Sequence, residues 1–424
     1  MRYVIIGMSA AAISAARAIR SLDRGGQLTL VSSEGHPPYA RIFITNYLAG
    51  KTSLEGMFIG GRSLDRELGA TFLTAKTVVG ADAAARRVYL ASGEALSYDH
   101  LLVASGARPV LPDFPGSSLA GVTGMRTLAD AQALSALLAT AAGRGGGHPP
   151  HVVVLGGGLV SLKTAEALVR RGAAVTVVVA SGQVLSQMAD AATADLVQER
   201  AGAAGVRFIM GEDVVAASGD EEHGLTAVEL RGGLGLRCDA LVVGKGVVPN
   251  VEFLQEAGVA VQRGIIVDRR GRANVEEVWA AGDVAEGPDA LTGRPAVMAM
   301  WPNAVRQGRA AGLDMAGAVP ENEGGVRVNI GSFFGLNVAS VGSVRAPEGA
   351  EEITVGPGHG YYRKVILKDH VVIGAILTGD VTGAGVWQYL AARHVSVDGF
   401  RTRLRSRSFT YQDVIPHPSL EPPV

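Results

Sequence analysis

The stretch HVVVLGGGLVSLKTAEALVRR, residues 151–171, decides the fold of this chain. It opens with a short apolar run, three glycines follow directly, and helix formers continue from there to residue 171. This order predicts a buried strand, a tight turn and a helix. A second apolar run at residues 175–180 completes a βαβ unit, so we expect parallel strands and an α/β fold.

The same pattern occurs at the N-terminus, where YVIIGMSAAAISAA begins at residue 3. An apolar run ends at Gly7, small helix formers occupy residues 10–19, and residues 27–34 form the next strand. The unit is about 30 residues long, which is the size of half a dinucleotide-binding domain. Two such units in a chain of 424 residues predict two or three domains.

The last part of the chain has a different pattern. The Gly/Pro-rich segment GRGGGHPP, residues 143–150, is a linker before the second unit. From about residue 325 onward β-branched residues are frequent, which predicts a third, mixed domain. Within it, YRKVILKDHVVIGAILTGD at residues 362–380 predicts a hairpin whose turn holds Lys368, Asp369 and His370.

Bulk composition narrows the classes of function. A net charge of −1 favours neither nucleic acid nor an anionic membrane as a partner. The single cysteine, Cys238, excludes an internal disulfide, a dithiol redox centre and a cysteine-ligated iron–sulfur cluster. The histidines show no HExxH or HxxxH spacing, so we expect no metal site. The chain starts in a strand, without a signal peptide or a membrane-spanning run, so we expect a cytoplasmic protein.

The first glycine turn is a weakened GxGxxG fingerprint, because Ser9 and Ala12 replace its second and third glycines. Small residues still let a diphosphate approach the N–H groups at the helix N-terminus. An ordinary tight turn of a doubly wound domain explains the same residues. The acid expected after the second strand is displaced to Glu34, behind Ser32 and Ser33. This carboxylate either binds a ribose hydroxyl or is a solvated loop residue.

The order of motifs along the chain carries a resemblance to a known family. The first unit is followed by YDHLLVASGARP (98–109), the second unit, CDALVVGKGVVPN (238–250) and VWAAGDVAE (278–286). This order resembles the flavoproteins with two dinucleotide-binding domains in the pyridine nucleotide–disulfide oxidoreductase superfamily, over nearly the whole chain. The resemblance implies an α/β fold with two Rossmann-like domains and a C-terminal mixed α+β domain. The implied parts are an FAD domain at 1–110 and 245–323, an inserted NAD(P) domain at 111–244, and an interface domain at 324–424.

In this family the first unit and the Ala-Gly-Asp turn bind FAD. Asp283 corresponds to the carboxylate that hydrogen-bonds the ribityl chain, although an N-cap before Val284 is an alternative. HPPYARIFITNYLAGK, residues 36–51, resembles a segment of rubredoxin reductases and nitrite reductase flavin domains, which places Arg41 and Lys51 near FAD unless they are surface side chains. The FAD contacts implied are Gly7, Ser9, Ala10, Ala11, Ser33, Glu34, Arg41, Lys51, Ala104, Ser105, Gly106, Arg108, Gly282 and Asp283.

The second unit would bind the nicotinamide nucleotide. Its strand at residues 175–180 ends without the acid that pairs with a ribose 2′-hydroxyl, and no arginine cluster replaces that acid. We therefore expect NAD(H) rather than NADP(H). Lys245 either contacts the nucleotide or is a solvated loop lysine. The NAD contacts implied are Gly156, Gly158, Leu159, Val160, Gly244, Lys245 and Gly246.

The chain departs from the family at two places. Residues 35–60 lack the redox cysteine of the disulfide reductases, so electrons must leave the flavin for an external acceptor. Lys163 stands where the family usually has a glutamate on the nicotinamide and flavin side. We interpret Lys163 as a catalytic-site residue that favours negative charge on reduced flavin; the alternative is a lysine that extends from the helix into solvent.

These features predict an FAD-dependent oxidoreductase that carries electrons between NAD(H) and a rubredoxin-, ferredoxin- or other iron–sulfur-type protein. GGGLVSLKTAEAL and VVGKGVVPN resemble most the NAD-linked flavin subunits of 2-oxoacid oxidoreductase complexes of the phenylglyoxylate dehydrogenase type. A free-standing NADH:rubredoxin or ferredoxin reductase, an NADH oxidase and a flavin-bearing interaction module are the alternatives. The arginines at 401, 403, 405 and 407 form either a solvated face or a docking patch for an acidic partner.

Overall fold

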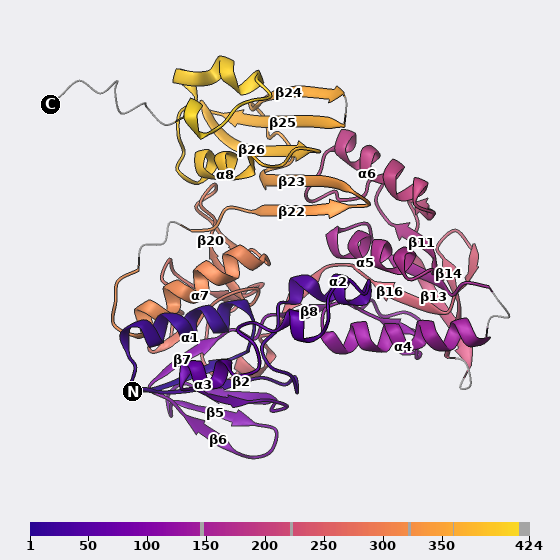
Figure 1. Ribbon diagram of the computed structural model, residues 1–424. Helices are drawn as coiled ribbons and strands as arrows, with labels where there is room; N and C mark the ends of the chain where they lie inside the picture. The colour runs from indigo at the N-terminus through magenta and orange to yellow at the C-terminus, as the bar shows by residue number, and fades with distance from the viewer. Residues whose placement is uncertain (145–147, 221–223, 321–323, 359, 415–424) are drawn as a thin grey trace. The chain divides into compact units, whose positions relative to one another are not determined.

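The computed structural model is shown in Figure 1. It describes residues 1–144, 148–220, 224–320, 324–358 and 360–414. Residues 145–147 of the predicted linker and the last ten residues of the predicted C-terminal domain lie outside the described residues. Packing within the chain defines two compact units: unit 1 is 1–110, 126–131 and 246–325, and unit 2 is 111–125, 132–245 and 326–424.

Unit 1 is built on a five-stranded sheet with the order β19-β7-β1-β2-β3. All four pairings in it are parallel, as predicted for βαβ connections. The helix that joins β1 to β2 is α1 (Ala10–Leu22), so the first predicted strand–turn–helix–strand unit is confirmed. The strands are β1 (Arg2–Ile6), β2 (Gln27–Val31), β3 (Thr71–Leu73), β7 (His100–Val103) and β19 (Val278–Ala280).

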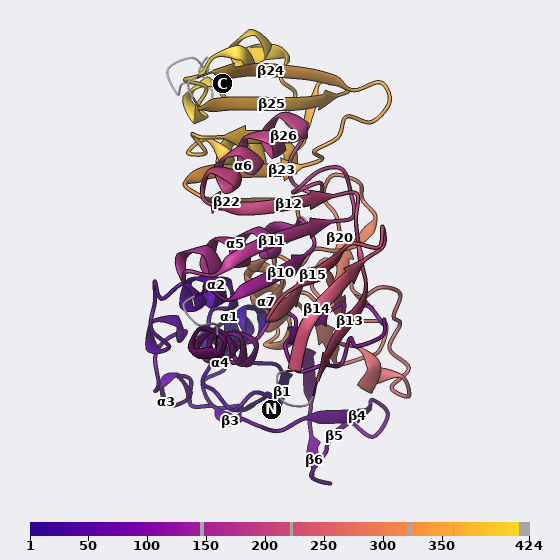
Figure 2. The same ribbon diagram turned by 90° about the vertical axis from the view of Figure 1, so that its right-hand side faces the viewer.

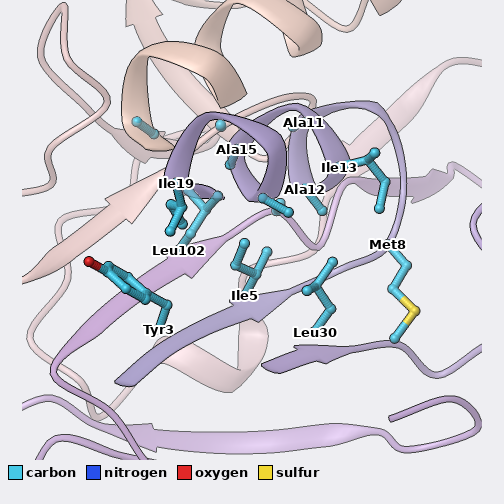
Figure 3. Close-up of a cluster of buried hydrophobic side chains, with 14 of the residues drawn as sticks. Tyr3, Ile5, Met8, Ala11, Ala12, Ile13, Ala15, Ile19, Leu30 and Leu102 are labelled. Carbon is cyan, nitrogen blue, oxygen red and sulfur yellow. The ribbon is translucent and has the colours of Figure 1, made fainter. Parts of the chain in front are cut away.

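Helix α1 lies against the sheet on one side and against α7 (Trp301–Met315) on the other. Figure 3 shows the first contact, where small and branched side chains of α1 meet Ile5, Leu30 and Leu102 of three adjacent strands. The second contact is closer, because a Cβ added at Gly308 of α7 would lie 2.1 Å from the carbonyl oxygen of Ala11. Backbone contact of this kind needs glycine and alanine on the facing surfaces, which explains the alanine-rich sequence of α1.

Three smaller sheets complete unit 1. The antiparallel pair β8 (Ala107–Pro109) and β17 (Val247–Pro249) forms where the chain leaves this unit and where it returns. The others are the sheets β4-β5-β6 and β18-β20-β21. The remaining elements are β4 (Val78–Asp82), β5 (Arg87–Leu90), β6 (Ala95–Ser97), β18 (Ile265–Ile266), β20 (Ala285–Pro288), β21 (Pro295–Val297), α2 (Ile44–Leu48) and α3 (Leu64–Leu68).

Unit 2 contains a second five-stranded parallel sheet, with the order β12-β11-β10-β16-β9. The stretch that decides the fold forms β10, the glycine turn and α5, and α5 leads into β11, as predicted. The elements are β9 (Val122–Thr123), β10 (His151–Leu155), β11 (Ala174–Val179), β12 (Val206–Met210), β16 (Ala240–Val243), α4 (Leu128–Arg144), α5 (Leu159–Arg170) and α6 (Ala191–Ala203). A three-stranded sheet follows β12, formed by β13 (Val214–Asp220), β14 (Gly224–Leu230) and β15 (Gly235–Arg237).

The C-terminal part of unit 2 is an antiparallel sheet with the order β22-β23-β26-β25-β24 (Figure 2). Helix α8 (Ala384–Ala392) packs on this sheet. Its strands are β22 (Val328–Phe333), β23 (Leu336–Gly342), β24 (Glu351–Gly358), β25 (Tyr361–Lys368) and β26 (Val371–Thr378). The predicted hairpin is β25–β26, and φ is 48° at Asp369 and 63° at His370 in its turn. Positive φ at both central residues is typical of a two-residue turn that matches strand twist.

The expected architecture, two Rossmann-like units and a C-terminal mixed domain, is confirmed. Within unit 2 the C-terminal sheet packs on α5 and α6. In the part of the chain that the structure describes, no helix combines the length and the apolar character needed to cross a membrane.

Candidate cofactor sites

The first glycine turn is pressed against the end of β7. Gly7 has φ of 120°, and a Cβ added there would lie 2.1 Å from the carbonyl oxygen of Ala104. Helix α1 begins after its N-cap Ser9, its first turn contains no acidic residue, and its first backbone bond runs from Ile13 to Ser9 at 2.9 Å. The N–H groups at the start of α1 therefore have no partner within the helix, and the dipole favours an anion there. This turn fits the diphosphate of a dinucleotide.

The second glycine turn repeats this geometry in unit 2. Gly156 has φ of 114°, and a Cβ added there would lie 2.4 Å from the carbonyl oxygen of Gly244. Gly158 is the N-cap of α5, the first turn of which also lacks acidic residues and exposes Val160. Ser161 replaces the third fingerprint glycine and approaches the Gly244 oxygen with its Oγ at 3.4 Å. Predicted NAD contacts at this turn therefore surround a second cradle suited to a diphosphate.

Glu34 lies at the edge of a pocket in unit 1 lined by Met8, Ser9, Ser32, Glu34, His36, Pro37, Pro38, Tyr39 and Arg41. Its carboxylate forms an ion pair with Arg41 and accepts a hydrogen bond from the Tyr39 hydroxyl at 2.5 Å. The pKa of Tyr39 is raised, mainly because the side chain is buried. Its hydroxyl therefore stays protonated and donates to Glu34. The carboxylate is therefore fixed in place and is not the solvated loop residue of the alternative. Ser33 beside it is exposed.

Asp283 follows β19 and forms an ion pair with Arg126, a residue that sequence reasoning missed. The two side chains are 14% and 23% exposed, respectively. Arg126 also donates from Nε to the carbonyl oxygen of Ala107 at 3.2 Å, and its own carbonyl accepts from Arg41 at 3.2 Å. Arg126 therefore links two predicted FAD contacts, Arg41 and Asp283. The alternative role of Asp283 as an N-cap is wrong, because the following residues enter β20 rather than a helix.

One local feature of the sequence, the helix start that follows it, indicates where Arg126 lies. Asp130 accepts hydrogen bonds at 2.8 Å from the backbone N–H groups of both Arg126 and Thr127. The spacing Thr127-x-x-Asp130 is that of a helix start, so the arginine is held at the N-terminal edge of α4 by local sequence. Its pairing with Asp283, 157 residues away, carried no such signal.

The other predicted FAD contacts fall into two groups. Ser105 and Arg108 are engaged with the returning chain: Ser105 donates to the Asn250 carbonyl at 2.8 Å, and Arg108 forms an ion pair with Glu252 at 2.5 Å. These bonds join the ends of β8 and β17, which is a structural role. Of the rest, Ala10 and Ala11 are buried in the first turn of α1, Ala104 is buried after β7, and the others lie at turns or at the surface. Gly282 has φ of 85° beside α1, Gly106 has φ of 70°, and Lys51 is exposed after α2.

Two predicted lysines of unit 2 have partners inside that unit. Lys163 Nζ donates to Glu166 at 2.5 Å and to the carbonyl oxygen of Ser332 in β22 at 2.7 Å. Its side chain is 20% exposed, so the ammonium joins α5 to the C-terminal sheet and does not extend into solvent. Lys245 forms an ion pair with Asp213 at 2.5 Å. The roles of both lysines at the nicotinamide stay predictions.

Cys238 lies buried in the apolar core of unit 2. Burial, with a smaller effect of Asp239, raises the pKa of its thiol to about 12. The thiol is therefore neutral and unreactive at physiological pH, and it packs as a small apolar side chain. Among the described residues, no group of three or more His, Cys, Asp and Glu side chains is arranged to hold a metal ion.

The arginine run near the C-terminus is mostly engaged with its own domain. Arg401 pairs with Glu351, Arg403 pairs with Asp413 at 2.8 Å, and the Arg407 guanidinium lies 4.9 Å from the centre of the Tyr361 ring. Arg401 and Arg403 are therefore paired with carboxylates of the same domain, which supports the solvated-face interpretation for these two arginines.

Comparison with known proteins identifies the same architecture. Residues 1–308 match the family described as pyridine nucleotide-disulphide oxidoreductase, and residues 328–388 match the rubredoxin NAD+ reductase C-terminal domain. The chain is 33% identical to the NADH-dependent phenylglyoxylate dehydrogenase subunit epsilon of Aromatoleum evansii, over 95% of this chain and 94% of that protein. It is 29% identical to the rubredoxin-NAD(+) reductase of Pseudomonas putida, over 75% and 80% of the two chains. Its fold is similar to that of a ferredoxin reductase from Rhodopseudomonas palustris, with a TM-score of 0.87, 24% identity and coverage of 97% and 99%.

Proposed function

Because the chain belongs to the pyridine nucleotide-disulphide oxidoreductase family, we propose that it carries electrons between NAD(H) and an iron–sulfur or rubredoxin-type protein. It is an oxidoreductase that uses FAD and NAD(H). The finer proposal is that it serves as the NAD-linked flavin subunit of a 2-oxoacid dehydrogenase complex. This is supported by the likeness to a phenylglyoxylate dehydrogenase subunit over 95% of the chain.

When bound, FAD supplies the redox chemistry, exchanging a hydride with the nicotinamide and single electrons with the protein partner. In unit 1 the α1 N-terminus after Ser9 would hold the FAD diphosphate. Glu34, held by Tyr39 and Arg41, offers its remaining acceptor positions to the adenosine ribose. Asp283 would hold the ribityl chain, and the ion pair with Arg126 fixes the orientation of that carboxylate.

In unit 2 the turn at Gly156–Gly158 and the start of α5 would hold the diphosphate of NAD(H). The loop after β11 carries Ser181 and Gln183 where an NAD-selecting acid is common, and the Ser181 hydroxyl donates to the Gln183 carbonyl at 2.9 Å. No arginine of that loop is available for a 2′-phosphate. We therefore propose NAD(H) as the physiological nucleotide.

The single observation that carries the electron-transfer proposal is the state of Cys238. This is the only thiol of the chain, and it is buried with a raised pKa. The chain therefore cannot pass electrons to a disulfide or a sulfenate of its own, as the disulfide reductases do. Electrons taken from NADH must leave for an external acceptor, and a one-electron carrier suits a flavin that releases electrons singly.

The experiment is an anaerobic titration of the FAD-loaded chain with NADH. We expect the visible flavin absorbance to bleach with one equivalent of NADH and to return when a rubredoxin or a ferredoxin is added. The matched control is Cys238→Ala, which removes the thiol and leaves a small apolar side chain in the core. Its bleaching and its recovery should equal those of the wild type. A variant that is reduced but fails to pass electrons on would contradict the thiol-free route.

A free-standing rubredoxin or ferredoxin reductase is the second candidate, supported by the rubredoxin NAD+ reductase C-terminal domain at residues 328–388. Native purification separates the two candidates. Isolation with iron–sulfur subunits and a thiamine-dependent enzyme supports the complex, and isolation as a single polypeptide that reduces rubredoxin supports the free-standing enzyme. In either case the chain alone should reduce dyes with NADH and should oxidise no 2-oxoacid.

Lys163 is proposed to influence the flavin from α5. Lys163→Glu changes the local charge by two units and should lower the flavin reduction potential, measured by dye equilibration. An unchanged potential, together with an unchanged rate of reduction by NADH, would limit this lysine to its contact with Ser332.

A further inference from the structure

The loop between β11 and α6 ends at Asp190, and this carboxylate joins two layers of unit 2. Asp190 is the N-cap of α6 and accepts a hydrogen bond from the Thr193 N–H at 3.1 Å. It also accepts one from the hydroxyl of Tyr362, on β25 of the C-terminal sheet, at 2.5 Å. Tyr362 is 5% exposed and the Asp190 side chain is 14% exposed, so this bond is partly shielded from water. A hydrogen bond to a charged acceptor in such a place is among the stronger ones.

A third group completes the surroundings of Asp190. Lys364, two residues along β25 from Tyr362, places its Nζ 4.0 Å from the carboxylate. The same ammonium forms an ion pair with Glu352 of β24. On the side of the C-terminal sheet, the carboxylate therefore faces the Tyr362 hydroxyl and the Lys364 ammonium. On its other side it caps the N-terminus of α6. This arrangement fixes the position of Asp190 relative to the sheet.

The loop in front of Asp190 is held by hydrogen bonds and reaches the second glycine turn. Leu185 donates its N–H to the carbonyl oxygen of Gly157 at 2.7 Å, and the Ala189 N–H donates back to Leu185 at 2.8 Å. The Gln183 side chain donates to the Ala189 carbonyl at 2.9 Å. Val184, Leu185, Met188 and Ala189 are all buried.

The contact between the loop and the turn is also tight. A Cβ added at Gly157 would lie 3.3 Å from the Cα of Val184 and 3.0 Å from a methyl group of Val179. Any displacement of the loop therefore reaches the backbone of the Gly156–Gly158 turn directly, because close-packed atoms transmit a shift. A continuous chain of contacts runs from Tyr362 through Asp190 and the loop to Gly157.

We propose that Asp190, held by Tyr362, is a positioning residue for nucleotide binding: it keeps the loop at residues 181–189, and through it the Gly156–Gly158 turn, in the shape that receives the dinucleotide diphosphate. The affinity of the turn for NADH is thus set in part from the C-terminal sheet. This inference rests on the proposed function, because it takes the second glycine turn as the NAD(H) site.

The test is Tyr362→Phe in the full FAD-loaded chain. The substitution removes one hydroxyl and leaves the buried ring in place. We expect the apparent Kd for NADH, from the concentration dependence of flavin reduction, to rise about three- to tenfold. The limiting rate of reduction and the FAD content should stay at wild-type values, because unit 1 is unchanged.

The matched control is Thr378→Val. Thr378 lies on the same sheet, is fully buried, and shares a hydrogen bond of 2.9 Å with Thr193 of α6. It therefore joins the same two layers through a hydrogen bond to α6 rather than to Asp190. We expect Thr378→Val to lower the melting temperature and to leave the apparent Kd for NADH unchanged.

A second variant, Asp190→Ser, keeps a capping oxygen for α6 but is too short to reach the Tyr362 hydroxyl. It should raise the apparent Kd as Tyr362→Phe does, and the double variant should add little further. A Tyr362→Phe protein that melts earlier yet binds NADH normally overturns the inference, as does an equal rise in Thr378→Val. A wild-type chain whose flavin NADH does not reduce instead refutes the proposed function, so the two failures are distinguishable.

Discussion

Gly308 of α7 offers the most direct test of how packing in unit 1 supports the flavin site. A Cβ added there would lie 2.1 Å from the carbonyl oxygen of Ala11 and 2.8 Å from its Cα. Both atoms are backbone, so no side chain can rotate away, and α1 and α7 must separate. Ala11 also belongs to the first turn of α1, which would present N–H groups to the FAD diphosphate.

The magnitude follows from two opposing effects. Alanine is favoured over glycine in a helix by about 1 kcal/mol, whereas overpacking a close contact costs about 1–3 kcal/mol and occasionally more. Because the contact is with backbone, we take the upper end, so Gly308→Ala should lose about 2 kcal/mol of unfolding free energy. For a domain of this size that corresponds to a fall in Tm of about 4–8 °C.

The assay is thermal unfolding of the FAD-loaded chain, with the FAD retained after gel filtration measured in parallel. The control is Gly202→Ala, at an exposed position of α6 where an added Cβ meets nothing within 4 Å. That variant should gain up to about 1 kcal/mol. We expect Gly308→Ala to lose both stability and FAD. A Gly308→Ala protein that is as stable as the Gly202→Ala protein would refute the argument from backbone contact.

Three further predictions concern single contacts. Arg126→Gln leaves a largely buried carboxylate without its counter-ion, so the Kd for FAD, measured by fluorescence quenching, should rise at least about tenfold. Gly244→Ala places a Cβ 2.0 Å from Ser161 Oγ, so it should weaken NADH binding and lower Tm. The double variant Gly244→Ala/Ser161→Gly removes the clashing hydroxyl and should recover most of the NADH affinity and of the Tm. A double variant that recovers neither would exclude this clash as the cause. Hydrogen bonds from Arg2 lower the pKa of Asp99 to about 2, so the stability it contributes is present above its unfolded pKa of about 3.9 and is lost as pH falls toward 2. Denaturant unfolding between pH 5 and about pH 2 should therefore show a shallower loss for Asp99→Asn than for the wild type.

The strand–turn–helix units could be predicted because their signals are local. An apolar run, a glycine with positive φ and a helix former lie within a few residues of one another, at Gly7 and again at Gly156. The hairpin at residues 362–380 is another such case, since Asp369 and His370 tolerate the positive φ that its turn requires. The order of these segments was enough to indicate the family.

The candidate site was predicted only in part. Glu34, Arg41 and Asp283 were selected singly, but the sequence offered no reason to connect them. The structure adds Tyr39, which holds Glu34, and Arg126, which pairs with Asp283. Lys163 was selected for its position on the helix, and its bond to the Ser332 carbonyl, 169 residues away, had no counterpart in any local pattern.

The amino-acid sequence by itself determined the two βαβ units, the glycine turns, the hairpin and the absence of a second thiol. Each depends on backbone preferences or residue identity within a short window. Only the tertiary structure decided which charges meet and which loop rests on which turn, as with Arg126 and Asp283 or Asp190 and Tyr362. Such pairs form because sheet order and helix packing bring distant segments together, and periodicity along the chain carries no information about that distance.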